Sequence, residues 1–211
     1  IPHYIYGRPP LARIPEIRAL VGVLQMASGR WAGLDPVEVR FMIECLLSRP
    51  SLYLDKASLK RVSDEIVASP KRLSAAIRSS ITRQHKPYQA DLIRDRADLL
   101  EIIATCTEPT ESVIDVLERY LIATNFASAI TKQSPSVEAA EVILANVDAF
   151  KMIASHHKGS IDQFLDAIDP LIDSAPVAPP STPHVWIGSI HRAKGDQWPV
   201  VFVPGLTERG F

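Results

Sequence analysis

The sequence predicts a mainly α protein: an array of about eight helices inserted into a small α/β part that the two ends of the chain form together. Helical periodicity and capping residues recur from residue 15 to residue 172. Runs rich in β-branched and aromatic residues, typical of strands, lie at residues 1–7, 185–190 and 200–203. A proline-rich segment, residues 174–184, follows the last helical stretch. This order is that of one domain inserted into another.

Composition limits the classes of protein to consider. The chain has 211 residues, of which 46% are hydrophobic and 22% charged, enough for one or two globular domains with a core. Its net charge is −1, so a contact with nucleic acid must come from a local patch. Two cysteines are too few for a disulfide framework, and no Cys/His spacing resembles a zinc site. With no apolar run of about 20 residues and no signal peptide, we expect a cytoplasmic protein without a membrane partner.

Each helix of the array is predicted from apolar spacing and a residue that starts it. In the first, residues 15–27, Ile17, Leu20 and Leu24 share a face. In the one at residues 88–106 we expect Leu92, Leu99, Ile102 and Cys106 to face the core. The remaining helices are expected at residues 36–48 after Asp35, 56–68 after Asp55, 70–85 after Ser69, 113–124, 137–155 after Ser136 and 161–172 after Ser160.

A polar loop, residues 189–197, separates the two apolar runs near the end of the chain. It reads Ser-Ile-His-Arg-Ala-Lys-Gly-Asp-Gln, and the runs on either side of it are expected to be strands buried on both faces. Loops at the carboxyl ends of parallel strands are where open α/β sheets bind ligands. Hydrogen-bond donors, positive charge and a glycine suit a contact with phosphate or nucleic acid.

Residues 189–202 resemble motif V of the UvrD/Rep-like superfamily 1 DNA helicases, whose pattern runs roughly Thr-x-His-x-x-Lys-Gly-Leu-Glu-Phe/Trp-x-x-Val-Phe. The chain keeps His191, Lys194, Gly195, Trp198 and Phe202 in register, with Ser189 for Thr and Asp196-Gln197 for Leu-Glu. The start of the chain is similar to the same family, in which Ile-Pro-Tyr-x-Val-x-Gly-Gly precedes a Glu-Ile-Lys sequence. The matching residues are Ile1, Pro2, Gly7, Glu16, Ile17 and Arg18.

The resemblance implies a division into helicase subdomains. Residues 1–10 and 185–211 would be a remnant of the RecA-like subdomain 2A, residues 11–173 the helical subdomain 2B, and residues 174–184 the hinge linker between them. The parent enzyme would use ATP and Mg²⁺ to translocate on single-stranded DNA and unwind duplex DNA, with roles in DNA repair or replication. Its partners would be both forms of DNA and the first RecA-like domain of the motor.

The resemblance also implies roles for residues of the 189–197 loop. Ser189, His191 and Arg192 would contact DNA. Lys194, Gly195 and Gln197 would belong to the nucleotide cleft, where the Gln amide can bond a ribose hydroxyl in place of the family's Glu. The sequence contains no Gly-x-x-x-x-Gly-Lys-Ser/Thr loop for phosphate, so we expect a fragment without catalytic residues, metal site or bound cofactor of its own.

A second candidate DNA contact lies between residues 66 and 90, which contain five Lys or Arg and no Asp or Glu. On a helical wheel of this patch, Lys71, Arg78 and Lys86 fall on the side opposite the apolar stripe, and such a face can follow a duplex backbone. The alternative is a solvated helix that the acidic region at residues 91–118 neutralises.

Two other functions remain open. A helicase–nuclease subunit of the same superfamily would have a nuclease domain elsewhere in its gene. A non-catalytic helical interaction module would not need the 189–197 loop to bind anything, and the departure at Asp196-Gln197 favours it.

Overall fold

A computed structural model describes residues 3–5, 14–108, 111–172, 185–187, 194–195 and 197–203. Over these residues the chain is mainly helical, as the sequence predicts, with nine α-helices, two short 3-10 helices and two three-residue strands. Contacts within the chain divide it into two units. One runs from Pro10 to Ser174, and the other combines Ile1–Pro9 with Ala175–Phe211.

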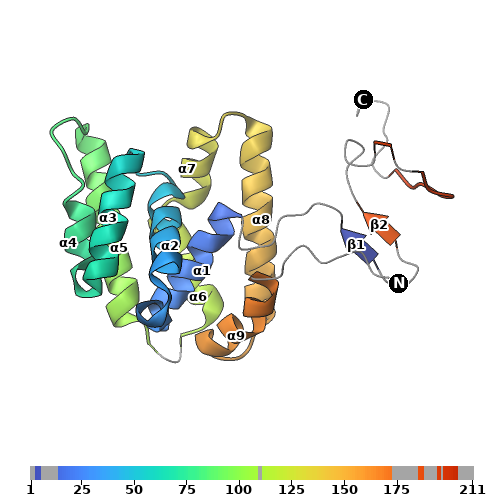
Figure 1. Ribbon diagram of the computed structural model, residues 1–211, viewed down its shortest axis with the longest axis horizontal. Helices are drawn as coiled ribbons and strands as arrows, with labels where there is room; N and C mark the ends of the chain where they lie inside the picture. The colour runs from blue at the N-terminus through green and yellow to red at the C-terminus, as the bar shows by residue number, and fades with distance from the viewer. Residues whose placement is uncertain are drawn as a thin grey trace. The chain divides into compact units, whose positions relative to one another are not determined.

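The helical unit contains every helix of the described chain (Figure 1). The α-helices are α1 (Pro15–Ala27), α2 (Pro36–Ser48), α3 (Lys56–Ala68), α4 (Leu73–Arg78), α5 (Pro87–Cys106), α6 (Val113–Ala123), α7 (Phe126–Gln133), α8 (Val137–His156) and α9 (Ile161–Ile172). The 3-10 helices are η2 (Arg30–Gly33) and η3 (Pro70–Arg72).

Four of the predicted N-caps are confirmed by hydrogen bonds. The carboxylate of Asp35 accepts from the backbone N–H of Val37 at 2.8 Å, and that of Asp55 from Ser58 at 2.7 Å. The Ser136 and Ser160 hydroxyls each accept from the backbone N–H three residues later, at 3.2 Å. Each cap satisfies a donor that the first turn of a helix leaves unpaired, which explains why these helices begin where the sequence predicts.

Helix α1 is the centre of the unit, packed against α2, α5, α6, α8 and α9. All its residues from Glu16 to Met26 are buried, so burial extends around the whole helix beyond the predicted apolar face. A Cβ on Gly22 would lie 2.6 Å from Cγ of Met42 in α2, which shows how closely these two helices approach. Polar side chains on α1 are therefore enclosed by its neighbours.

The single helix expected over residues 70–85 is wrong. The structure has η3 followed by α4, which ends at Arg78. The hydroxyls of Ser79 and Ser80 donate to the carbonyls of Ala76 and Ile77, both at 2.7 Å. Such short-range bonds from Ser side chains compete with the helical backbone pattern, which explains the early end.

The expected core face of residues 88–106 is wrong for three of its four residues, whereas the fourth, Leu99, is partly buried and packs against the core. Leu92 and Ile102 are 39% and 47% exposed and Cys106 is exposed, whereas Ile93, Ala97, Leu100 and Ile103 are buried. The buried face includes Arg96. Charged residues are rarely buried, so Arg96 makes this face of the helix look solvent-exposed in the sequence.

Helix α7 was not predicted. It is only eight residues long and directly follows Asn125. The φ of 46° at Asn125 interrupts the helical conformation between α6 and α7.

In the other unit the two ends of the chain pair. Strand β1 (His3–Ile5) runs parallel to β2 (Val185–Ile187), with His3 opposite Val185 and Ile5 opposite Ile187. Two strands of three residues do not identify a larger sheet, so a RecA-like origin remains a prediction.

The expected strand at residues 200–203 is wrong. These residues form no strand, and Val200, Val201 and Phe202 are 67%, 64% and 86% exposed. Burial of the preceding run on both faces is wrong too, since Val185 is 47% exposed. An apolar run becomes a central strand only where strands flank it on both sides. Within the part of the chain that the structure describes, β2 pairs with β1 alone.

Candidate functional site

The DNA side of the 189–197 loop lies outside the described residues. Ser189, His191 and Arg192 belong to this part, so their contacts with DNA stay predictions. Lys194, Gly195 and Gln197 are described and all three are exposed. Gly195 has φ of 96°, in the left-handed region that side-chain-bearing residues rarely adopt. The glycine of the motif therefore occupies a turn whose backbone geometry favours glycine.

Two tryptophans connect strand β2 with the residues that follow this loop. The ring centroids of Trp186 and Trp198 are 6.4 Å apart, with 47° between the ring planes. Trp198 is half-buried, and its ring lies beside that of Trp186. The pair brings the two ends of the loop together.

The three cations proposed to share a helical face do not share one helix. Lys71 lies in η3, Arg78 is the last residue of α4, and Lys86 directly precedes α5. Because the helix ends at Arg78, the single continuous basic face is wrong. A role of these residues in DNA binding stays a prediction.

Part of this basic region is neutralised by acidic neighbours. Arg78 forms an ion pair with Asp98 of α5 and also donates to the Ser74 hydroxyl at 3.3 Å. Arg72 lies 3.5 Å from Glu65. Lys71, Arg83 and Lys86 form no ion pair with any residue that the structure places. The pairing of Arg78 favours the alternative of a helix neutralised by residues 91–118.

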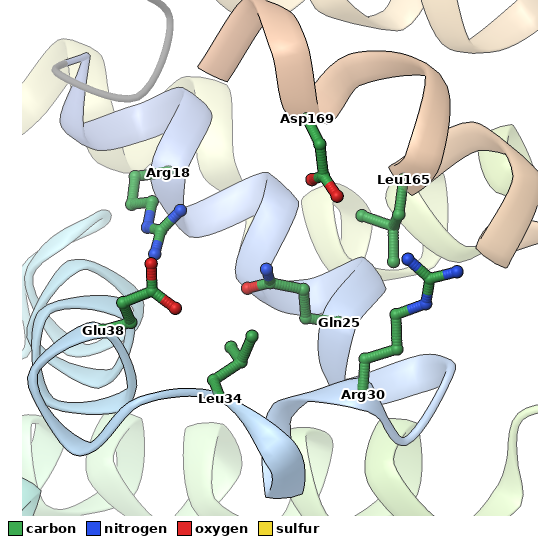
Figure 2. A pocket seen from close by; sticks show the side chains of 7 residues that line it. All are labelled: Arg18, Gln25, Arg30, Leu34, Glu38, Leu165 and Asp169. Atoms are coloured by element: carbon green, nitrogen blue, oxygen red, sulfur yellow. The ribbon is translucent and has the colours of Figure 1, made fainter. Parts of the chain in front are cut away.

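The structure adds a pocket that the sequence did not predict. It lies within the helical unit, between α1, α2 and α9, and has a volume of about 160 Å³ (Figure 2). Its lining residues come from three separate stretches of the chain: Arg18, Gln25, Arg30, Leu34, Glu38, Leu165 and Asp169.

One cation of the pocket is fully paired. Arg30 donates from Nε to Asp162 at 2.6 Å, from Nη1 to Asp166 at 2.7 Å and from Nη2 to the Asp162 carbonyl at 3.1 Å. The hydrogen bond with Asp166 raises the pKa of Arg30 and lowers the pKa of the Asp166 carboxyl. Arg30 therefore connects η2 to α9 through these hydrogen bonds and lines one side of the pocket.

Two buried side chains of the pocket each have a polar atom without a hydrogen bond to any described residue. Arg18 and Gln25 are 7% and 8% exposed. Neither Nε of Arg18 nor Oε1 of Gln25 has a hydrogen-bond partner in the described part of the chain. Figure 2 shows both side chains extending from α1 into the pocket, with Glu38 directed toward Arg18 and Asp169 entering from α9. The ring of Phe41 lies 5.8 Å from the Arg18 guanidinium carbon and covers one side of it.

The sequence contains a signal for this pocket. Arg18 and Gln25 are seven residues apart in a helix whose only other polar side chain is Glu16, so they share one face two turns apart. Their burial depends on α2 and α9, which local periodicity does not reveal.

Metal and membrane sites receive no support from the described residues. No group of three or more His, Cys, Asp or Glu among them is arranged to hold a metal ion. None of the helices in the described ranges combines the length and the apolar character that crossing a bilayer requires.

Comparisons of the chain with protein families and with curated proteins find no match.

Proposed function

We propose that this chain is part of a UvrD/Rep-like ATP-dependent DNA helicase. In this proposal the helical unit is subdomain 2B, and the unit formed by the chain ends is part of the RecA-like subdomain 2A. The parent enzyme couples ATP hydrolysis to movement along single-stranded DNA and to unwinding of the duplex.

The motif at residues 189–202 carries this proposal, and the parallel pairing of β1 with β2 supports it. The paired strands are separated in sequence by the whole helical unit. This arrangement fits an inserted domain, because the chain leaves one strand, forms the helical unit and returns to pair with the strand it left. The motif then follows directly on the returning strand, where open α/β sheets place their ligand-binding loops.

The proposal assigns different tasks to the residues of the loop. Ser189, His191 and Arg192 contact the sugar–phosphate backbone of single-stranded DNA, which needs hydrogen-bond donors and positive charge. Gly195 gives the backbone the conformation with which the loop turns toward the nucleotide cleft. Gln197, exposed beside it, donates to or accepts from a ribose hydroxyl.

The chain by itself does not fit ATP and Mg²⁺. The sequence has no phosphate-binding loop, and the described residues include no cluster of three or more His, Cys, Asp or Glu side chains that could hold a metal ion. We therefore assign nucleotide binding and hydrolysis to the first RecA-like domain of the motor acting together with this one.

The DNA-track assignment is tested by fluorescence anisotropy with a labelled oligo(dT) over a range of salt concentrations. Affinity is expected to fall with salt, with a slope of about −0.7 for each phosphate neutralised. His191→Ala is expected to weaken binding roughly three- to tenfold through loss of one hydrogen bond. His156→Ala is the matched control, because His156 is an exposed histidine of α8. Binding that is insensitive to salt and equal in both variants would contradict the assignment.

A further inference from the structure

Another pocket of the helical unit lies where η2, α2, α3 and η3 meet, and it has a volume of about 160 Å³. All the described residues that line it are apolar, and they include Leu34, Pro36, Val39, Val67 and Pro70. A charged ligand would lose water there without gaining a counter-charge from these walls. The walls therefore favour a neutral ligand.

Trp31 supplies the one polar side-chain group among the described residues of this pocket. The residue is 8% exposed, and its indole Nε1–H donates to no atom of the described residues. This N–H is not among the side-chain atoms that are fully enclosed without a partner, so it keeps accessible surface beside the pocket that Trp31 lines. An indole N–H is only a donor, and in a buried residue it usually finds an acceptor. The pocket therefore favours a ligand that accepts one hydrogen bond.

The local sequence also limits the number of donors and fixes the walls. Pro36 is the first residue of α2 and Pro70 the first of η3, and a proline has no backbone N–H to donate. The Leu34 N–H donates to the Trp31 carbonyl at 3.4 Å at the end of η2, and α2 packs against α3. The walls thus belong to packed elements of a single unit, which is typical of a largely pre-formed ligand site.

The volume limits the ligand to about one ring or one branched chain, because an apolar cavity of about 150 Å³ holds benzene. A nucleobase or a sugar carries several polar groups, and most of them would lose their hydrogen bonds to water among these apolar walls. A small apolar molecule with one accepting oxygen does not have this disadvantage.

We propose that this pocket binds a small neutral molecule that has an apolar ring or branched chain and a single carbonyl oxygen. The carbonyl accepts from the Trp31 Nε1–H, and the apolar part packs against Val39, Val67 and the rings of Pro36 and Pro70. The site uses residues of the helical unit alone, so it stands or falls independently of the helicase proposal.

The test is a titration of the isotope-labelled full chain with cyclohexanone, followed by heteronuclear NMR. The chain has three tryptophans, and Trp31→Phe identifies which indole N–H peak belongs to Trp31. Cyclohexanone is expected to shift this peak in a saturable manner, with a dissociation constant in the millimolar range, and to leave the indole peaks of Trp186 and Trp198 in place. Cyclohexanecarboxylate and cyclohexylammonium have the same ring with a charge, and neither is expected to bind.

Variants locate the binding in this pocket. Trp31→Phe keeps a ring but removes the N–H, and it is expected to weaken binding roughly fivefold, measured through the backbone amide peaks of Ala32 and Leu34. Val67→Phe fills the pocket from a half-buried position of its wall and is expected to abolish binding. Val142→Phe, the same change at an exposed position of α8, is expected to leave the affinity unchanged. Absence of a saturable shift of the Trp31 indole peak, equal binding of either charged analogue, or unchanged affinity of W31F or V67F would each overturn the proposal.

Discussion

Arg96 on α5 is a buried cation that the core accommodates without a carboxylate. It is 5% exposed and donates to the carbonyls of Leu46 and Pro50, the latter at 3.5 Å, and to the Tyr120 hydroxyl at 3.2 Å. Leu46 lies near the C-terminus of α2, where unpaired carbonyls and the helix dipole favour a positive charge. Burial raises the pKa of Tyr120, whose protonated hydroxyl donates to the carbonyl of Arg49 at 3.0 Å. Arg96 therefore acts as a cap for the end of α2.

Replacing Arg96 by methionine is expected to destabilise the protein by roughly 3 kcal/mol, because the buried carbonyls of Leu46 and Pro50 lose their donor. Urea denaturation followed by circular dichroism measures the change. Arg94→Met on the same helix is the control. Its pair with Asp91 is solvent-exposed, and its loss is expected to cost less than about 0.5 kcal/mol. Equal effects of the two substitutions would show that Arg96 does not cap α2.

At the scale of elements, ion pairs connect helices that are distant in sequence. Arg30 of η2 binds Asp162 and Asp166, which lie one turn apart on α9. Asp64 of α3 similarly pairs with Arg40 of α2. In each case the hydrogen bonds from the cations lower the pKa of the carboxyl, Asp166 through Arg30 and Asp64 through Lys60 and Arg40. Such groups make stability depend on pH.

The direction of this dependence follows for Asp166. Its folded-state pKa lies below the unfolded value, so the carboxylate stabilises the fold above the unfolded pKa of about 4 and that contribution is lost as the pH falls through the folded pKa. Asp166→Asn is therefore expected to lower the melting temperature at pH 7, and the gap to the unsubstituted protein should shrink toward pH 3. Thermal denaturation across this range measures it, with Asp148→Asn as control. A difference in melting temperature between the two proteins that stays constant from pH 7 to pH 3 would contradict a stabilising role of the ionised Asp166 carboxylate.

At the scale of the whole molecule, the apolar core that the described residues form belongs to one of the two units. Every buried hydrophobic residue of the described chain lies between Ile14 and Ile168, within the helical unit. In the other unit, the described apolar residues Val185, Val200, Val201 and Phe202 are exposed. Among the described residues, the free energy of folding gained from apolar burial therefore comes from the helical unit.

A chain limited to residues 14–172 is expected to fold on its own and to melt within about 2 °C of the full protein, because a unit with its own core is able to fold alone. Circular dichroism at 222 nm on both proteins measures this. A decrease of more than about 5 °C in the shorter chain would mean that the unit formed by the chain ends contributes to the core.

The helix boundaries show which features of the fold residues close together in the sequence can predict. Asp35, Asp55, Ser136 and Ser160 mark helix starts that the structure confirms, because a cap bonds to a backbone N–H within three residues. The prediction over residues 70–85 was wrong because two serine hydroxyls end the helix early. The described part of the 189–197 loop has a turn at Gly195 with φ of 96°, and the DNA and nucleotide contacts of the loop stay predictions.

The sequence by itself determined the helical class of this protein and most of its helix boundaries, since periodicity and capping act between residues close in the chain. Only the tertiary structure decided which polar residues are enclosed. Arg96 meets a carbonyl 50 positions away, and Arg30 meets Asp162 at a separation of 132. Burial and pairing of this kind depend on which distant helices pack together, and the pocket around Arg18 and Gln25 exists only because α2 and α9 enclose one face of α1.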